Sequence, residues 1–341
     1  MQKLDPIDDV FAGRRRVSAH KMRSMIHEPE FAPSPLLEIP ELSRVAGVAR
    51  LFVKDESKRP LGNFKVLGGT LAALRALARN STKPRRLICA SDGNHGLAVA
   101  AAAREAGAEA SIYLPIGASD FRAARIEEVG GRIEWIEGTY DDAVEAALAA
   151  AANNEGILVP DTSANIYDEV VADVMSGYQL ISSELAKQLP APPSHLFVQA
   201  GVGGLAAAMA EGLAERLASP PRIIVVEPET AACVAAALRA GTPVRISGAL
   251  KTSAEMLSCG LASTPATRIL IEHNAIPLTV SEVDLSNAVA ILRDTAFLLT
   301  TASGATGLAG LLKASRDEDL RDELQLDETS RVLLILTEGA S

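Results

Sequence analysis

Residues 86–106 decide the fold class. They run Arg-Leu-Ile-Cys-Ala, then Ser-Asp-Gly-Asn-His-Gly, then Leu-Ala-Val-Ala-Ala-Ala-Ala-Arg-Glu-Ala. The short apolar run 86–90 predicts a buried strand, and the polar, glycine-containing run 91–96 predicts a turn. The alanine-rich run 97–106 predicts a helix, which Gly107 would end. A strand that passes through a polar turn into a helix is the beginning of a βαβ unit.

The same alternation continues along the chain to residue 159. Short apolar runs predict strands, and longer runs between them predict helices. The expected strands are 110–114, 132–136 and 156–159, and the expected helices are 119–129 and 140–152. Short strands that alternate with helices of this length are typical of a parallel sheet.

After a proline-rich stretch at 189–193, the pattern resumes and indicates a second lobe. Strands are expected at 195–200, 222–226 and 331–336, with a helix at 205–218. At roughly 150 residues per domain, 341 residues fit two domains. We therefore expect an α/β protein of two lobes, each with a mainly parallel, twisted sheet flanked by helices. The larger lobe would comprise residues 1–66 and 190–341, and the smaller lobe residues 67–189.

The composition excludes several classes of protein. With 33 Lys and Arg against 43 Asp and Glu, the net charge is −10, which disfavours binding to nucleic acid or to anionic membranes. The three cysteines are far apart, so neither a zinc cluster nor a disulfide framework is expected. No apolar run is long enough for a membrane span, and the first residues do not resemble a secretory signal. A cytoplasmic protein is expected.

Lys65 is the first candidate for chemistry. It follows a Gly62-Asn63-Phe64 turn and begins a helical run that contains Gly68 and Gly69. A partly desolvated lysine amine is a nucleophile that forms Schiff bases with carbonyl groups. An ordinary surface lysine is the alternative, although the neighbouring glycines favour close approach of a ligand.

Carboxylates and an amide follow two of the expected strands. Asp92, Asn94 and His95 lie in the turn after strand 86–90, where α/β proteins bind ligands. Asp92 is a candidate general base and Asn94 a candidate hydrogen-bond donor, whereas His95 alone is expected to be structural. Asp161 follows strand 156–159. Helix or turn capping is the alternative role for each of these short polar side chains.

The glycine-rich turn in Gln199-Ala200-Gly201-Val202-Gly203-Gly204-Leu205-Ala206 predicts a phosphate site. It connects a strand to a helix, whose first N–H groups and positive dipole end bind anions. The spacing Gly201-x-Gly203-x-x-Ala206, with Glu227 after the next strand, also fits a dinucleotide-binding fingerprint. The turn alone does not choose between the two ligands. Near the end of the chain, the Thr337 hydroxyl could bond a heteroaromatic nitrogen.

Four stretches, around Lys65, Asp92–Gly96, Gly201–Leu205 and Thr337, follow one another along the chain. In this order they resemble the fold type II family of pyridoxal-phosphate (PLP) enzymes, which includes threonine and serine dehydratases. The resemblance covers about residues 35–341. Within the family it is most similar to diaminopropionate ammonia-lyases, through Asp92-Gly-Asn-His-Gly96, Asp161-Thr162, Ala200-Gly-Val-Gly203 and Thr337-Glu-Gly339. Dehydratases usually carry Ser or Ala at the position of Asp92.

The resemblance implies a role for each matching residue. Lys65 would hold the cofactor as a Schiff base, and Asn94 would bond the ring hydroxyl. Thr337 would face the pyridine nitrogen. The backbone of the turn would bind the cofactor phosphate through Gly201, Val202, Gly203, Gly204 and Leu205. A homodimer is a further expectation from the family.

Asp92 and Asp161 resemble the two carboxylates that take the α-proton from the D- and L-substrate. The resemblance departs at Ser163–Tyr167, and at Ala302, where the family often has a carboxylate. We expect a PLP-dependent carbon–nitrogen lyase that acts on a small amino acid, 2,3-diaminopropionate, and yields pyruvate and ammonia. The alternatives are a threonine or serine dehydratase, a nicotinamide dehydrogenase that uses the glycine turn, and a non-catalytic binder.

Overall fold

The computed structural model describes residues 31–80, 85–91 and 93–340. These residues form two compact units. Within the described ranges, the first unit comprises residues 31–32, 59–163 and 167–177, and the second comprises residues 33–58, 164–166 and 178–340. The chain passes from one unit to the other at 32/33, 58/59 and 177/178, and residues 164–166 also belong to the second unit. The domain boundaries expected at 66/67 and 189/190 stay a prediction.

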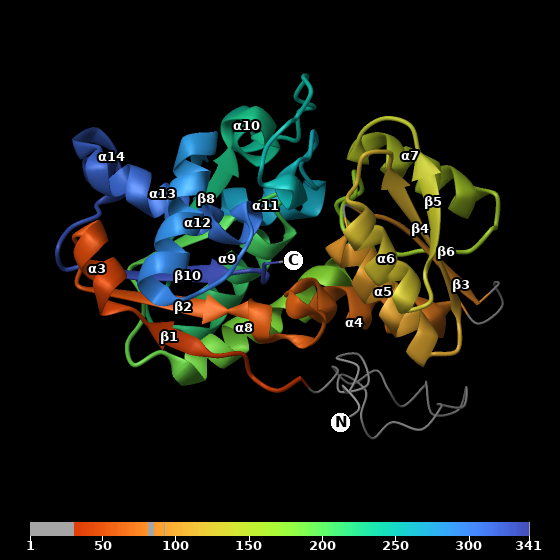
Figure 1. The fold of residues 1–341 in the computed structure, drawn as a ribbon, viewed down its shortest axis with the longest axis horizontal. Helices are drawn as coiled ribbons and strands as arrows, with labels where there is room; N and C mark the ends of the chain where they lie inside the picture. Colours follow the sequence, from red (N-terminus) through yellow and green to blue (C-terminus); the bar gives the residue numbers. More distant parts are fainter. Residues whose placement is uncertain (1–30, 81–84, 92, 341) are drawn as a thin grey trace. The chain divides into compact units, whose positions relative to one another are not determined.

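The first unit contains a four-stranded parallel sheet in the order β5-β4-β3-β6 (Figure 1). The strands are β3 (Arg86–Ala90), β4 (Glu109–Pro115), β5 (Arg132–Ile136) and β6 (Ile157–Leu158). The helices between them are α5 (Asn94–Glu105), α6 (Asp120–Glu128) and α7 (Tyr140–Ala152). Each helix makes the long crossover that parallel strands require. The alternation expected from the sequence is confirmed.

The second unit contains a six-stranded sheet in the order β1-β2-β10-β7-β8-β9. The strands are β1 (Leu36–Glu38), β2 (Arg50–Asp55), β7 (His195–Gln199), β8 (Arg222–Pro228), β9 (Ile276–Val280) and β10 (Arg331–Leu336). Only the β1–β2 pair is antiparallel. The central strands β7 and β10 are buried along almost their whole length, and successive apolar residues fill their middles, as expected for parallel strands covered on both faces. The predicted α/β fold class is confirmed.

Nine further α-helices accompany the strands in the described ranges. They are α3 (Pro40–Ala46), α4 (Lys65–Arg79), α8 (Glu169–Gln188), α9 (Gly204–Arg216), α10 (Cys233–Ala240), α11 (Thr264–Glu272), α12 (Glu282–Ala296), α13 (Ala302–Arg316) and α14 (Glu318–Leu324). Among the described residues, none of the helices combines the length and apolar character that crossing a bilayer requires.

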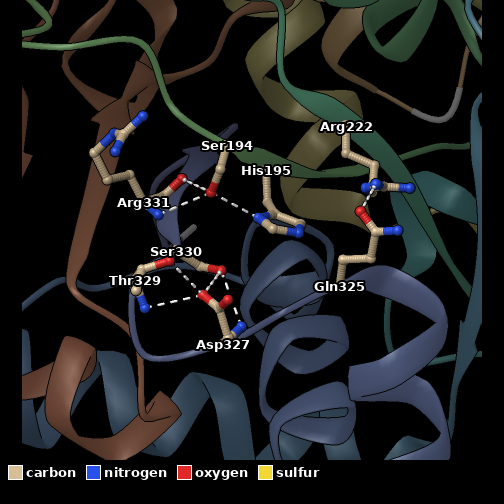
Figure 2. Close-up of a pocket in the computed structure, with 8 residues that line it drawn as sticks. All are labelled: Ser194, His195, Arg222, Gln325, Asp327, Thr329, Ser330 and Arg331. Carbon is tan, nitrogen blue, oxygen red and sulfur yellow. Dashed lines mark hydrogen bonds between the residues drawn. The ribbon is translucent and has the colours of Figure 1, made fainter.

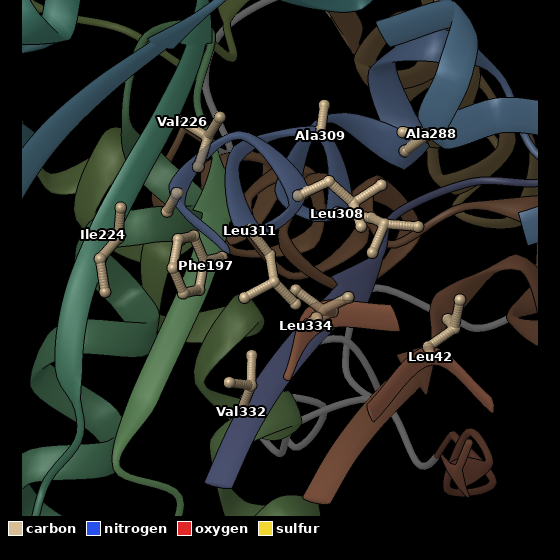
Figure 3. Close-up of a cluster of buried hydrophobic side chains, with 14 of the residues drawn as sticks. Leu42, Phe197, Ile224, Val226, Ala288, Leu308, Ala309, Leu311, Val332 and Leu334 are labelled. Atoms are coloured by element: carbon tan, nitrogen blue, oxygen red, sulfur yellow. The ribbon is translucent and has the colours of Figure 1, made fainter. Parts of the chain in front are cut away.

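Helix α13 forms the centre of the core of the second unit. Its Leu308 and Leu311 pack with Phe197 of β7 and Leu334 of β10 (Figure 3). The helix approaches β7 very closely at Gly307, where an added Cβ would lie 2.7 Å from the backbone oxygen of Phe197. Glycine is therefore required at this position by the distance between helix and strand.

Gly307→Ala should lower the free energy of unfolding by about 1–3 kcal/mol, because the added methyl group meets backbone that cannot rotate away. This range is the net effect, after the gain of about 1 kcal/mol that alanine brings to a helix interior. Chemical denaturation checks the prediction. Ser315→Ala, on the same helix, is the control and should change stability by less than about 0.5 kcal/mol. Equal stabilities of wild type and Gly307→Ala would contradict the close packing.

Candidate active site

The glycine-rich turn connects β7 to α9 in the second unit. Gly203 has φ of +98° and precedes the helix, a conformation that side chains rarely adopt. A Cβ on Gly201 would lie 3.2 Å from Cys259 Sγ and 3.3 Å from Met256 O. The first turn of α9 contains no acidic residue. The helix start therefore presents N–H groups and a positive dipole end, with no carboxylate of its own first turn to compete for them.

Thr337 follows β10 at the same edge of the sheet. Strands β7 and β10 are parallel neighbours, so their carboxyl ends lie together. The Thr337 hydroxyl is buried and accepts a hydrogen bond of 3.1 Å from Gln199 Nε2, at the end of β7. The structure thus brings together, within one unit, the predicted turn and the predicted hydroxyl.

Lys65 is the first residue of α4, in the first unit. The buried Asn63 fixes this helix start, since its Oδ1 accepts from the Lys65 backbone N–H at 3.0 Å. The preceding turn contains Leu61 and Gly62 at φ of 64° and 72°. The Lys65 ammonium donates to Asp161 Oδ2 at 2.5 Å. The two residues singled out from distant parts of the sequence are therefore direct partners.

Asp161 is 8% exposed and bonded through both oxygens. The Tyr140 hydroxyl donates to Oδ1 at 2.6 Å. Burial favours a higher pKa for Asp161, but the charge and hydrogen bond of the Lys65 ammonium and the hydrogen bond of the Tyr140 hydroxyl outweigh it, so the pKa lies well below its usual value. The carboxylate is consequently ionised, and its position is fixed by three elements of the first unit.

Tyr140 was not predicted from the sequence. It is a buried residue at the start of α7, directly after a Thr139–Asp142 capping box. The capping box gives a sequence signal for the helix start, but no signal indicates that the phenol contacts a carboxylate 21 residues away.

The turn after β3 holds the remaining candidates of the first unit. Asn94 begins α5, whose N-cap Gly93 has φ of 139°. Asp92 lies outside the described residues. His95 is buried, and its Nε2 lies 2.8 Å from Val159 O, which can only accept, so Nε2 carries the proton. Burial lowers the pKa of His95 and keeps it neutral. This backbone contact agrees with a structural role.

Glu227 has a local structural role that the dinucleotide hypothesis did not anticipate. Its buried carboxylate accepts from the backbone N–H groups of Val234 and Ala235, at 2.8 and 2.7 Å, at the start of α10. Burial raises the pKa of Glu227 to about 8, against the effect of these two hydrogen bonds. Because both oxygens bind this helix start, the carboxylate is not presented to a ribose.

A polar pocket of about 310 Å³ lies at the opposite edge of the same sheet (Figure 2). It is lined at the beginnings of β7, β8 and β10, whereas ligands of parallel α/β sheets bind beyond the carboxyl ends. Several lining side chains bond one another, such as Ser194 with His195 and Arg222 with Gln325 (Figure 2). This pocket is therefore separate from the candidate residues at the carboxyl edge.

Comparison with models of protein families shows to which family the chain belongs. Residues 28–338 match the model of the family described as pyridoxal-phosphate-dependent enzymes. The chain belongs to this family. The predicted cofactor, pyridoxal phosphate, is thereby confirmed, and the dehydrogenase alternative is wrong.

Two relatives and one solved structure are among the proteins similar to this chain. The diaminopropionate ammonia-lyase of Salmonella typhimurium is 32% identical over 91% of this chain and 86% of its own length. The human serine dehydratase-like protein is 31% identical over 85% of this chain and 86% of its own length. The crystal structure of Escherichia coli diaminopropionate ammonia lyase, in complex with an aminoacrylate-PLP azomethine reaction intermediate, matches with a TM-score of 0.82 at 28% identity. It covers 95% of this chain and 89% of that chain.

The candidate residues have the donor chemistry that a PLP enzyme needs. A dianionic phosphate suits the α9 start, with its glycine turn and no acidic residue in the first turn. A buried hydroxyl at Thr337 suits a ring nitrogen, and the 22% exposed Lys65 amine remains accessible to an aldehyde. The residues present therefore fit the cofactor.

The loop at Ala302 lacks the carboxylate that the family often has there, but the carboxylate of Glu338 lies at this loop. Thr301 is the N-cap of α13, and its hydroxyl donates to the carboxylate of Glu338. Glu338 follows Thr337 and is 7% exposed. A carboxylate thus lies at this loop, although it comes from the chain end and not from the loop itself.

In the cofactor-free protein, Asp161→Asn should lower the free energy of unfolding by about 1–3 kcal/mol near neutral pH, since it removes charged hydrogen bonds. Because the native pKa of Asp161 is lowered, its contribution is full above the unfolded value of about 3.9 and is lost as the pH falls below it. Urea denaturation at several pH values measures the difference.

Asp294→Asn is the matched control, because it breaks an exposed pair with Arg293 on α12 and should change stability little. A difference between wild type and Asp161→Asn that persists unchanged into acid would contradict the ionised Lys65–Asp161 pair.

Proposed function

We propose that the protein is a PLP-dependent ammonia-lyase that converts 2,3-diaminopropionate and water into pyruvate and two molecules of ammonia. The observation that carries the proposal is the Lys65–Asp161 contact in a chain 32% identical to a diaminopropionate ammonia-lyase over 91% of its length. The contact supports the proposal because the Asp161 carboxylate lies beside the amine that the family resemblance makes the cofactor-binding lysine.

Each candidate residue has a specific task in this proposal. Lys65 binds the cofactor aldehyde, and Asn94 donates to the ring hydroxyl. The turn of Gly201, Val202, Gly203, Gly204 and Leu205 binds the phosphate, and Thr337 faces the pyridine nitrogen. When bound, the cofactor supplies an electron-withdrawing ring that stabilises negative charge on the substrate α-carbon. The chemistry of the donors at α4 and at the β7 and β10 ends supports these assignments.

Asp161 and Asp92 remove the α-proton from opposite enantiomers in this proposal. A diamine substrate carries positive charge near neutrality, and the two carboxylates attract it. The Lys65 ammonium lowers the pKa of Asp161, whereas burial raises it. Once the Lys65 amine is engaged and loses its charge, burial and the loss of this partner make Asp161 a stronger base. The Tyr140 hydroxyl holds the carboxylate in place through this change.

A threonine or serine dehydratase is the second candidate, supported by the relative that is 31% identical to this chain. A neutral hydroxyl substrate has no second ammonium group to pair with a further carboxylate. The buried Asp161 therefore favours the diamine. We also propose a cytoplasmic homodimer, consistent with three free cysteines, and light scattering after size-exclusion chromatography tests the assembly.

Turnover of D- and L-diaminopropionate, serine and threonine should identify the substrate. We expect pyruvate and ammonia in a ratio of one to two from diaminopropionate, at a higher kcat/KM than from either hydroxy amino acid. Lys65→Ala should remove both turnover and the visible absorbance of bound cofactor. Faster turnover of threonine or serine than of either diamine would favour the dehydratase.

Asp92→Asn and Asp161→Asn should each reduce turnover by about 10²–10⁴-fold for one enantiomer of diaminopropionate, because each removes one general base. Both variants should keep the absorbance of bound cofactor, which separates loss of the base from loss of binding. Steady-state kinetics with each pure enantiomer measures the effect. Unchanged rates for both enantiomers in both variants would remove the two-base model.

A further inference from the structure

The turn that precedes Lys65 is held in an unusual conformation. Leu61 has φ of 64° and Gly62 has φ of 72°, so two consecutive residues lie in the left-handed region. Glycine adopts this region freely, but the Cβ of a leucine crowds its own backbone there. Such a conformation persists only where the surrounding structure holds it. The contacts of the buried Leu61 therefore help to decide how α4 begins.

Two donors from different elements bind the Leu61 carbonyl oxygen. Asn63 Nδ2 donates to it at 2.9 Å, and Arg125 Nη2, from α6, donates to it at 2.7 Å. A carbonyl oxygen has two lone pairs, so these two bonds satisfy it. The bond from a guanidinium is charge-assisted and is the stronger of the two kinds. Arg125 thus ties the turn to a helix 64 positions away, within the first unit.

Asn63 carries the constraint from the turn to Lys65. Its Nδ2 donates to Leu61 O, and its Oδ1 accepts from the Lys65 backbone N–H at 3.0 Å. Phe64, the N-cap of α4, makes no side-chain cap hydrogen bond, so the side-chain cap of this helix comes from Asn63. If the Leu61 carbonyl turned away, the Asn63 amide would be released and the first turn of α4 would fray. The Lys65 amine would then lose its fixed direction toward Asp161.

Helix α6 has anchors other than the Arg125 guanidinium. Its Ala123 and Ile126 are buried. The stem of Arg122 packs beside Gly93, where an added Cβ would lie 2.8 Å from Arg122 Cδ. A change of Arg125 alone should therefore remove the bond to the turn and leave the first unit folded.

We propose that Arg125 is a positioning residue that holds the Leu61 turn in its left-handed conformation and thereby fixes the direction of the Lys65 amine. The inference rests on the proposed function, in which Lys65 carries the cofactor and Asp161 is a base. Attack on an aldehyde and proton transfer both depend on how precisely the reacting groups are placed. Arg125 acts on the amine through the backbone of the turn and the Asn63 amide.

The reactivity of the Lys65 amine in the cofactor-free protein tests the inference without any substrate. Trace labelling with acetic anhydride, read by proteolysis and mass spectrometry, compares Lys65 with the exposed Lys251 of the same sample. In the wild type the bond to Asp161 occupies the amine, which slows its labelling. Arg125→Met should speed the labelling by roughly three- to tenfold, because a loosened amine leaves Asp161 more often. Arg125→Lys keeps a cationic donor and should stay within about twofold of the wild type.

A double-variant cycle separates positioning from general damage. Leu61→Gly removes the Cβ that disfavours the left-handed region, so in its presence Arg125→Met should change the labelling by less than about twofold. Leu61→Asn serves the same purpose where the glycine variant fails to fold, since asparagine also tolerates this region. Arg104→Met is the matched control, because this exposed arginine of α5 lies beside Gly130, and it should leave the labelling unchanged. The same full effect of Arg125→Met in all backgrounds would contradict the role of the turn.

Steady-state kinetics give a second readout. In Arg125→Met, kcat for diaminopropionate should fall by roughly three- to tenfold with little change in KM, because the amine is misplaced for chemistry and not for substrate binding. Unchanged labelling of Lys65 in a folded Arg125→Met protein would overturn the inference, whatever the substrate. Faster labelling in that variant of an enzyme that releases no ammonia from diaminopropionate would uphold Arg125 and refute the substrate.

Discussion

The pairing of the Lys65 ammonium with the Asp161 carboxylate is the interaction on which the chemistry of the candidate site depends. At 2.5 Å, it joins the start of α4 to Asp161, three residues after the end of β6, and the Tyr140 hydroxyl binds the other carboxylate oxygen. The Lys65 ammonium lowers the pKa of Asp161 and so keeps this buried carboxylate ionised. The contact also couples the two groups, because any reaction that neutralises the amine changes the basicity of the carboxylate. One contact therefore connects cofactor attachment with proton transfer.

The second unit contributes a different constraint, the parallel alignment of β7 and β10. This pairing puts Gln199 and Thr337 side by side at the carboxyl edge of the sheet, next to the turn that begins α9. Helix α13 lies close enough for Gly307 to touch the β7 backbone, and its N-terminal turn supplies carbonyl oxygens to the Gln199 amide. The anion-binding turn and the buried hydroxyl are thus held by one packed core.

Much of this arrangement was predictable from the sequence, because it depends on local patterns. The strand expected at 86–90 is β3, and the strand expected at 331–336 is β10, with the same bounds. The glycine turn and Lys65 each occupy the expected start of a helix. Strand and helix periodicity, glycine content and proximity to a strand end are properties of neighbouring residues, so a single sequence carries them.

The residues that the sequence did not reveal act through contacts between distant segments. Tyr140 contacts a carboxylate 21 positions away, and Gln199 contacts a hydroxyl 138 positions away. Glu227 fits a dinucleotide fingerprint in spacing, yet its carboxylate binds the start of α10. Such partners follow from strand order and helix packing, for which no local pattern exists.

The roles proposed for the candidate site all require that Lys65 is the lysine that carries the cofactor. Borohydride reduction of the PLP-loaded protein, followed by proteolysis and mass spectrometry, tests it most directly, because reduction makes the lysine–cofactor linkage permanent. We expect a pyridoxyl-phosphate group on the peptide that contains Lys65. The same group on another lysine, with Lys65 unmodified, would contradict it.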